Sequence, residues 1–221
     1  MTITKIERQK RNPRRVNVYL DGEFAFGLHE NVLVKFGLRK GDTLDKPFLD
    51  KIQLDEEHHL AKEKALRLLG HHARSEKELR DKLREKEFHP DAIDSAIESM
   101  RQLGLVNDLA YARAYAHDAL MKKPSGTILL QQKLRLKGID RNTIQSVLTE
   151  VGETNDEQSL ALTAARQILK RYEKSKKHLD PLKKKQLVTA NLARRGFNWQ
   201  IIASTFHILF KQSIVEQEEG E

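Results

Sequence analysis

Five apolar positions recur three times along this chain of 221 residues, in the same order each time. The second copy lies 51 positions after the first, and the third lies 58 positions after the second. Each copy is typical of a helix, a tight break and a second helix. Such a small unit buries its apolar face poorly alone, so the pattern predicts stacked units that present a long binding surface. The three sets are Leu79, Leu83, Phe88, Ile93 and Ile97; Leu130, Leu134, Ile139, Ile144 and Leu148; and Val188, Leu192, Phe197, Ile202 and Phe206.

An apolar stripe with helical spacing precedes each pair and adds a leading helix to every unit. These stripes run over 60–69, 111–120 and 160–169. We therefore predict a mainly α protein, a tandem array of three three-helix repeats whose helix pairs are helix-turn-helix-like. The predicted segments are a β-rich N-terminal cap over 1–50, three-helix repeats over 51–106, 107–152 and 153–210, and a frayed tail over 211–221.

The N-terminal residues follow an alternating pattern that is typical of strands. Apolar residues alternate from Val16 to Leu20 and again from Phe24 to Leu28, and the Asp21-Gly22 pair between them predicts a hairpin. Because this cap is small, we expect it to pack on the first helices. Three further elements are expected in it: a strand around Ile3 and Ile6, a short helix over 31–36, and a short strand around Leu44.

Local signals predict where the helices of the repeats begin and end. Ser75 and Glu78 have the spacing of a capping box, and we expect Gly70 to end the helix before them. Glycines occupy the corner of the second and third repeats at 138 and 196, whereas the first repeat has Glu87 there. A side chain at this corner requires either a left-handed backbone or a different turn, so the first repeat is expected to differ.

Three further expectations concern the second and third repeats. Tyr111 and Tyr115 could stack on nucleic-acid bases, but their spacing beside alanines favours core packing. We expect Trp199 to pack between helices as well. A basic connection over 170–178 should separate the first two helices of the third repeat.

Charge is concentrated in the second half of the chain. The net charge is +8, and residues 121–199 contain 17 Lys and Arg against 7 Asp and Glu, whereas residues 51–120 contain 12 against 14. This surplus favours a polyanion, or a protein bound to one, as partner. The chain has no cysteine, no apolar run long enough for a membrane span and no apolar signal segment. We therefore expect a cytoplasmic monomer without disulfides, thiolate metal sites or membrane contact.

Four stretches of this sequence resemble the RecX family, the regulators of the bacterial RecA recombinase. The resemblance covers about residues 57–208, and it rests on order, spacing and repetition rather than on a single motif. Residues 1–50 are similar to the extension of longer family members. The four stretches are Ser75-Glu76-x-Glu78-Leu79-x-x-Lys82-Leu83, Gly104-Leu105-Val106-Asn107-Asp108-x-x-Tyr111-Ala112, Gly126 with Leu134-x-x-Lys137-Gly138-Ile139, and Lys183 to Phe206 with Arg194-Arg195-Gly196-Phe197.

The resemblance implies a non-enzymatic regulator that binds the RecA filament on single-stranded DNA. It also implies that the protein mainly inhibits filament growth, ATPase activity and strand exchange, and so regulates DNA repair, recombination and the SOS response. Contact with single-stranded DNA itself is expected to be weak and without sequence preference. Two alternatives stay open from the residues: a direct DNA-binding helix-turn-helix regulator, and a helical scaffold for another acidic protein.

Candidate binding residues are basic side chains of the second and third repeats, on positions that face solvent. Contact between such side chains and phosphate makes binding strongly salt-dependent. In the first repeat, cations alternate with carboxylates three and four residues apart, which indicates surface ion pairs instead. The ten candidates are Lys122, Lys123, Lys133, Arg135, Lys137, Lys183, Lys184, Lys185, Arg194 and Arg195.

Candidate catalytic chemistry is sparse. Histidine pairs at 58–59 and 71–72 bracket a helix, but adjacent histidines point in different directions and show no metal-ligand spacing. A helix N-cap explains Asn107 and Asp108. No phosphate-cradling glycine loop, nucleophile elbow or carboxylate cluster occurs. We therefore predict no enzymatic activity and no catalytic, cofactor-binding or metal-binding residues.

Overall fold

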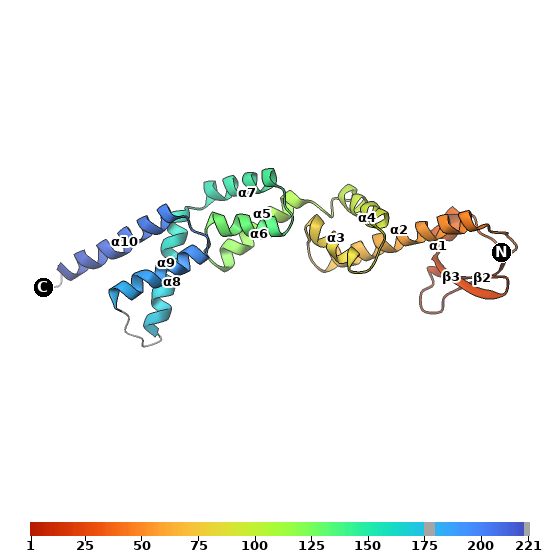
Figure 1. The fold of residues 1–221 in the computed structure, drawn as a ribbon, viewed down its shortest axis with the longest axis horizontal. Helices are drawn as coiled ribbons and strands as arrows, with labels where there is room; N and C mark the ends of the chain where they lie inside the picture. Colours follow the sequence, from red (N-terminus) through yellow and green to blue (C-terminus); the bar gives the residue numbers. More distant parts are fainter. Residues whose placement is uncertain (175–179, 219–221) are drawn as a thin grey trace. The chain divides into compact units, whose positions relative to one another are not determined.

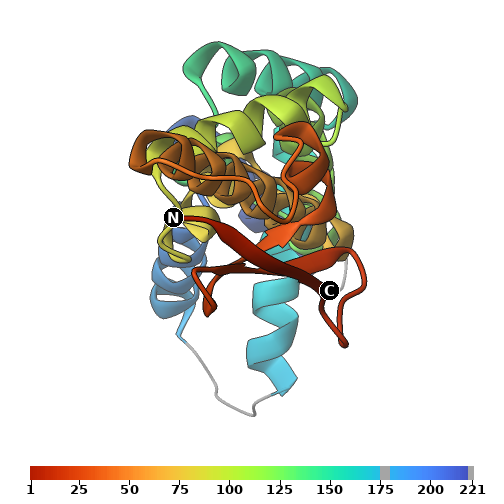
Figure 2. The same cartoon turned by 90° about the vertical axis from the view of Figure 1, so that its right-hand side faces the viewer.

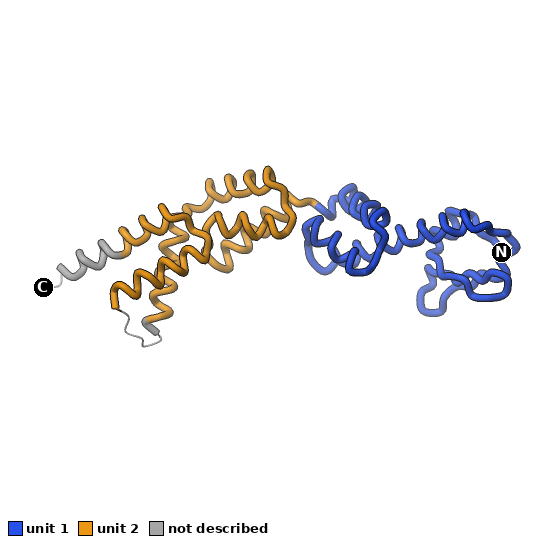
Figure 3. Tube along the Cα trace, viewed as in Figure 1, with its two compact units in different colours: residues 1–106 blue, residues 107–221 orange. Residues whose placement is uncertain are grey.

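The computed structural model describes residues 1–174 and 180–218. It divides into two compact units, Met1–Val106 and Asn107–Glu221, which Figure 3 shows in different colours. The described residues form ten helices and one three-stranded sheet (Figure 1). This confirms a mainly α protein with a small β-rich segment at its N-terminus.

The sheet forms where the alternating pattern predicts it. Strands β1 (Ile3–Arg8), β2 (Arg15–Leu20) and β3 (Glu23–His29) pair antiparallel in this order. Asp21 and Gly22 connect β2 to β3 with φ angles of 50° and 96°, so both turn residues have left-handed backbones. Every second residue of β2 is buried, which gives the sheet one apolar face.

The sheet shares its core with the first half of a long helix. Helices α1 (Glu30–Lys35) and α2 (Lys46–His71) follow the strands, and Leu49 and Ile52 of α2 lie in the same buried cluster as the strand residues. Figure 2 shows the strands beside these helices. The prediction of a strand around Leu44 is wrong. Thr43 makes only an isolated bridge to Thr2, because α2 begins soon afterwards.

The second half of α2 belongs to the first repeat. Its Ala61 and Ala65 are buried in a second cluster with residues of α3 (Glu76–Arg84) and α4 (Pro90–Gln102). The predicted end of the helix at Gly70 is wrong. Gly70 does not have a left-handed backbone, and α2 continues until His72 becomes extended at φ −167°.

In the first repeat, residues close together in the chain determine the N-terminal end of α3 and the turn between α3 and α4. Ser75 Oγ accepts the Glu78 amide at 3.2 Å and Glu78 Oε2 accepts the Ser75 amide at 3.3 Å, which confirms the capping box. At the corner between α3 and α4, Glu87 adopts φ 61°, close to the 82° of Gly138 and the 78° of Gly196. The first repeat therefore keeps the left-handed corner without its glycine.

Unit two contains two further groups of three helices. Helices α5 (Asp108–Lys122), α6 (Thr127–Leu136) and α7 (Arg141–Thr154) surround one core. Helices α8 (Glu157–Lys174), α9 (Pro181–Arg194) and α10 (Trp199–Glu218) surround another. Tyr111 and Tyr115 pack against the first core with ring centroids 6.2 Å apart, as core packing predicts. The exact boundaries between repeats stay a prediction.

The third repeat differs from its prediction in three places. Helix α8 continues to Lys174, so the first part of the expected basic connection is helical, and residues 175–179 lie outside the described residues. Helix α10 continues to Glu218 through most of the segment predicted as a tail, and 219–221 lie outside the described residues. Trp199 is 70% exposed, because Phe197, at 3%, fills the corner instead.

Candidate functional site

A close contact between two glycines joins the second and third repeats inside unit two. The Gly126 amide, just before α6, donates to the Arg195 carbonyl at 2.8 Å, and the Ile128 amide donates to the Gly196 carbonyl at 3.2 Å. A Cβ at Gly126 would lie 2.2 Å from the Gly196 carbonyl oxygen, and a Cβ at Gly196 would lie 2.2 Å from the Leu129 nitrogen. Both positions therefore require glycine.

The start of α6 receives a second support from α8. Gly126 has no side chain with which to cap this helix. Glu157 supplies the missing acceptor, because its Oε1 accepts the Thr127 amide at 2.9 Å and the Thr127 hydroxyl at 3.2 Å. The glycine contact and this carboxylate together fix the position of α6 relative to α8 and to the α9–α10 corner.

This junction brings four of the ten predicted binding residues together. Lys123 and Lys133, from the second repeat, line the same cavity as Arg194 and Arg195, from the third. The cavity has a volume of about 260 Å³. Its remaining lining residues are Ala119, Ser125, Leu129 and Asn191.

A second cavity of about 540 Å³ continues from the first and shares Lys123, Asn191 and Arg195 with it. Residues of α8 form its other wall, where Arg171 and Tyr172 lie beside Gln167 and Ile168. We call the two cavities together the basic cleft. Five cationic side chains line it, and none of the described residues that line it is acidic.

Arg195 is the most constrained cation of the basic cleft. Its side chain is half-buried, its Nη1 donates to the Pro124 carbonyl at 3.4 Å, and burial lowers the pKa of its guanidinium. An arginine stays charged despite such a shift. A cation that is partly removed from water and surrounded by other cations favours an anionic ligand.

The other six predicted residues lie outside the cleft. Lys122 is exposed, with its Nζ 3.9 Å from Asp118 Oδ2, and Arg135 is exposed on α6. Lys137 places its ammonium 5.9 Å from the centre of the Tyr115 ring. Lys183, Lys184 and Lys185 lie in the first turns of α9 and line neither cavity.

Sequence reasoning missed four residues of the cleft: Gln167, Arg171, Tyr172 and Asn191. Arg171 and Tyr172 fall in the segment that we expected to be a connection. A helical reading of α8 to Lys174 places Arg171 four residues after Gln167, on the same side of the helix. This four-residue spacing is the feature of the sequence from which Arg171 could have been predicted to lie beside Gln167.

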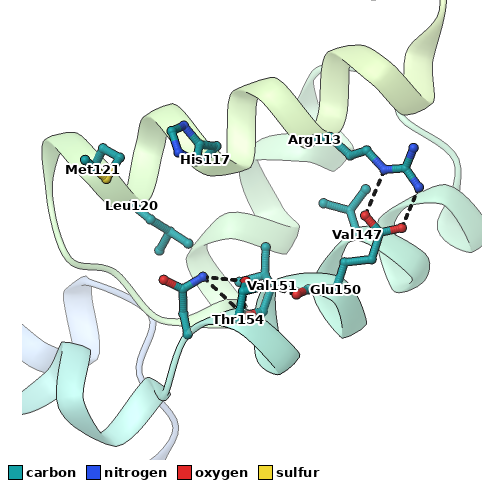
Figure 4. Close-up of a pocket in the computed structure, with 9 residues that line it drawn as sticks. Arg113, His117, Leu120, Met121, Val147, Glu150, Val151 and Thr154 are labelled. Atoms are coloured by element: carbon teal, nitrogen blue, oxygen red, sulfur yellow. Dashed lines mark hydrogen bonds and ion pairs between the residues drawn. The ribbon is translucent and has the colours of Figure 1, made fainter.

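Unit two also has a largely apolar groove between α5 and α7, with a volume of about 440 Å³. Figure 4 shows His117, Leu120 and Met121 of α5 on one side and Val151 of α7 on the other. Arg113 closes one end of the groove, because its guanidinium binds both carboxylate oxygens of Glu150 at 2.7 and 2.8 Å. Among the described residues that line the groove, this pair supplies the Arg and the Glu, and His117 is the one histidine.

Several basic residues of the first repeat are held in ion pairs, as their alternation with carboxylates predicts. Glu76 accepts hydrogen bonds from Arg80 and Arg101, and Arg80 also contacts Asp94. Ion pairs between residues three positions apart join Lys82 to Glu85 and Arg84 to Asp81.

Among the described residues, no group of three or more His, Cys, Asp or Glu is placed to hold a metal ion. In the same part of the chain, no helix has the length and apolarity needed to cross a membrane.

Three sequence families match successive parts of this chain. The regulatory protein RecX N-terminal domain matches residues 1–45, the RecX first three-helix domain matches 61–100, and the RecX second three-helix domain matches 107–148. These segments contain the sheet, most of the first repeat, the helices α5 and α6, and the first part of α7.

Individual proteins are similar over 70% to 96% of this chain. Regulatory protein RecX of Clostridium acetobutylicum is 33% identical over 214 residues, which cover 96% of this chain and 98% of the relative. That of Bacillus subtilis is 34% identical over 202 residues, which cover 91% and 75%. A crystal structure of regulatory protein RecX superposes with a TM-score of 0.72 at 29% identity, covering 95% of this chain and 98% of that chain. RecX from Lactobacillus salivarius gives 0.60 at 27% identity, covering 70% and 97%.

Proposed function

Because the chain belongs to the family of RecX regulatory proteins, we propose that it binds the filament that RecA recombinase forms on single-stranded DNA. Binding restrains filament growth, ATP hydrolysis and strand exchange, and thereby regulates DNA repair and recombination. The protein acts by binding alone, as a monomer without catalysis or cofactor, in the cytoplasm where that filament forms. The observation that carries the proposal is the similarity to regulatory protein RecX over 96% of this chain.

The charge of unit two supports a partner that contains nucleic acid. Residues 107–221 hold 19 Lys and Arg against 13 Asp and Glu, whereas residues 1–106 hold 21 against 19. In the first repeat, Arg80, Lys82, Arg84 and Arg101 pair with neighbouring carboxylates. Unit two instead gathers cations in a cleft whose described lining is free of carboxylates, which suits a polyanion.

A direct regulator that reads duplex DNA is supported less well. In a helix-turn-helix, the second helix of the pair enters the major groove and carries the contacting side chains. In unit two the second helices are α7 and α10. Helix α7 has Arg141 as its single Lys or Arg, and the part of α10 with described side chains, residues 199–209, has none. The cations lie on α6 and α9, the first helices of the pairs.

The proposal is tested by the ATPase activity of RecA on single-stranded DNA, with this protein added below the RecA concentration. We expect turnover to fall and filaments to shorten in electron micrographs. Added free single-stranded DNA serves as the control, because relief of inhibition in proportion to that DNA would indicate simple removal of the DNA. Unchanged turnover together with unchanged filament length would overturn the proposal.

A further inference from the structure

We propose that the basic cleft of unit two binds consecutive phosphates of a single-stranded DNA backbone, an assignment that rests on the proposed function and locates its DNA contact. The two cavities are adjacent and share Lys123, Asn191 and Arg195. Arg171 adds a cation to the larger cavity, and Lys133 and Arg194 add two to the smaller one. A chain of phosphates can place one negative group in each cavity, with the shared residues between them.

The chemistry of the lining fits a phosphodiester. Guanidinium groups bind phosphate oxygens in pairs, and the cleft offers three of them, from Arg171, Arg194 and Arg195. Side-chain amides of Gln167 and Asn191 add neutral polar groups to the larger cavity. The apolar part of the lining, chiefly Leu129 and Ile168, offers no hydrogen-bonding group that could read a base edge.

Hydrogen bonds hold the chain at the position where the two cavities of the cleft meet. Arg195 precedes Gly196, and its carbonyl accepts the Gly126 amide at 2.8 Å. Its side chain is held by the Pro124 carbonyl, and Lys123 immediately precedes that proline. The Arg195 side chain and the backbone at Lys123 are therefore positioned before any ligand arrives, which lowers the entropic cost of ordering Arg195 on binding.

An acidic protein segment is the competing ligand, because carboxylates also pair with arginine. One feature of the lining favours DNA. Tyr172 packs partly against the core of the third repeat and also lines the larger cavity beside its cations, and stacking on aromatic side chains accompanies backbone binding in single-strand sites. Binding through phosphates predicts affinity that is indifferent to base sequence and steeply dependent on salt.

The test measures binding of a fluorescently labelled oligothymidylate by anisotropy at several salt concentrations. The variant Lys123→Gln/Arg171→Gln removes two cleft cations and leaves Arg195 in place. Arg141→Gln/Arg166→Gln is the matched control, since it removes the same charge from exposed positions of unit two that line neither cavity. Thermal unfolding of each variant shows that the fold is retained.

We expect the cleft variant to lower the slope of log affinity against log salt by about 1.4, that is about 0.7 for each lost phosphate contact. Over a fourfold rise in salt, wild type then loses about sevenfold more affinity than the variant does. The control should keep the wild-type slope. Equal slopes for cleft and control variants would overturn the assignment. Competition by polyglutamate as strong as competition by oligothymidylate would overturn it in favour of an acidic protein ligand.

The oligothymidylate experiment and the RecA ATPase experiment can fail independently of each other. If the cleft is assigned wrongly but the function is right, wild type inhibits the RecA ATPase and the cleft variant binds oligothymidylate as wild type does. If the function is wrong but the cleft binds phosphate, the slope changes as expected while wild type leaves RecA turnover unaffected.

Discussion

Glu87 is the residue at which local strain is clearest. It holds a left-handed backbone at φ 61° where the other two repeats have glycine. The sequence left two possibilities, a left-handed residue or a different turn, and the structure shows the first. A left-handed backbone costs a residue with a Cβ about 1–2 kcal/mol, whereas glycine adopts it freely.

Replacement of this residue should therefore stabilise the first repeat. We expect Glu87→Gly to raise the free energy of unfolding by about 0.5–1 kcal/mol, after allowance for the greater flexibility of glycine in the unfolded chain. Urea unfolding followed by circular dichroism measures the change. Lys86→Gly is the neighbouring control, since Lys86 lacks a positive φ, and it should destabilise. A loss of stability in both variants would contradict the strain at Glu87.

His59 gives unit one a dependence on pH. Burial lowers its pKa below the usual 6.5, and the charges of His29 and Arg15 act in the same direction, whereas Glu56 and Glu63 oppose it. The His29 and His59 rings lie 3.9 Å apart, so two charged imidazoles would repel each other. The folded state thus prefers neutral His59, while the unfolded chain takes up a proton near pH 6.5.

Because the unfolded state binds more protons, stability should fall as the pH drops below about 6.5 towards the folded pKa. Urea unfolding at pH 7.5 and pH 5.5 measures this fall, and His59→Gln should reduce it. His117→Gln serves as control, since that histidine is exposed on α5. An identical fall in wild type and His59→Gln would remove His59 as its source.

At the scale of elements, the contact between the start of α6 and the α9–α10 corner has the largest consequence. A methyl group at Gly126 would overlap the backbone of Gly196. We expect Gly126→Ala to lower the free energy of unfolding of unit two by about 1–3 kcal/mol and to weaken oligonucleotide binding, because the cleft opens.

Gly152→Ala is the control for that substitution. Gly152 lies inside α7, and a Cβ there would meet no atom within 4 Å. Alanine at this place should stabilise the helix by up to about 1 kcal/mol. If both alanine variants gained stability, the close approach of the two glycine segments would be refuted.

The elements show which features the sequence could predict. The Asp21-Gly22 hairpin and the Ser75 capping box depend on residues close together in the chain, and both were predicted. The Gly126 to Gly196 contact could not be, since it joins positions 70 residues apart. The prediction that Trp199 packs between helices was wrong for the same reason. Whether a side chain at the start of a helix is buried depends on which other residue fills the corner, and here Phe197 fills it.

At the scale of the whole molecule, the two units divide the charge unequally and use it differently. Cations of the first repeat hold α3 and α4 together, since Arg101 of α4 binds Glu76 of α3 and Arg80 of α3 binds Asp94 of α4. Five cations of unit two line the cleft, and none of the described residues that line it is a carboxylate. The charge distribution along the sequence predicted a basic contact surface, but the two cations on α6 lie in different surroundings, because Lys133 lines the cleft and Arg135 does not.

That division gives the last prediction. Lys133→Glu and Arg135→Glu make the same charge reversal two residues apart on α6, so they change the net charge equally and the local environment differently. We expect Lys133→Glu to raise the concentration needed for half inhibition of the RecA ATPase about tenfold, equivalent to about 1.4 kcal/mol of binding, because it places a carboxylate among the cleft cations. Arg135→Glu should have a much smaller effect. Should Lys133→Glu fail to fold, Lys133→Gln makes the same comparison with Arg135→Gln. Equal effects of the two reversals, with unchanged melting curves, would assign the contact to the whole cationic face of α6 instead of the cleft.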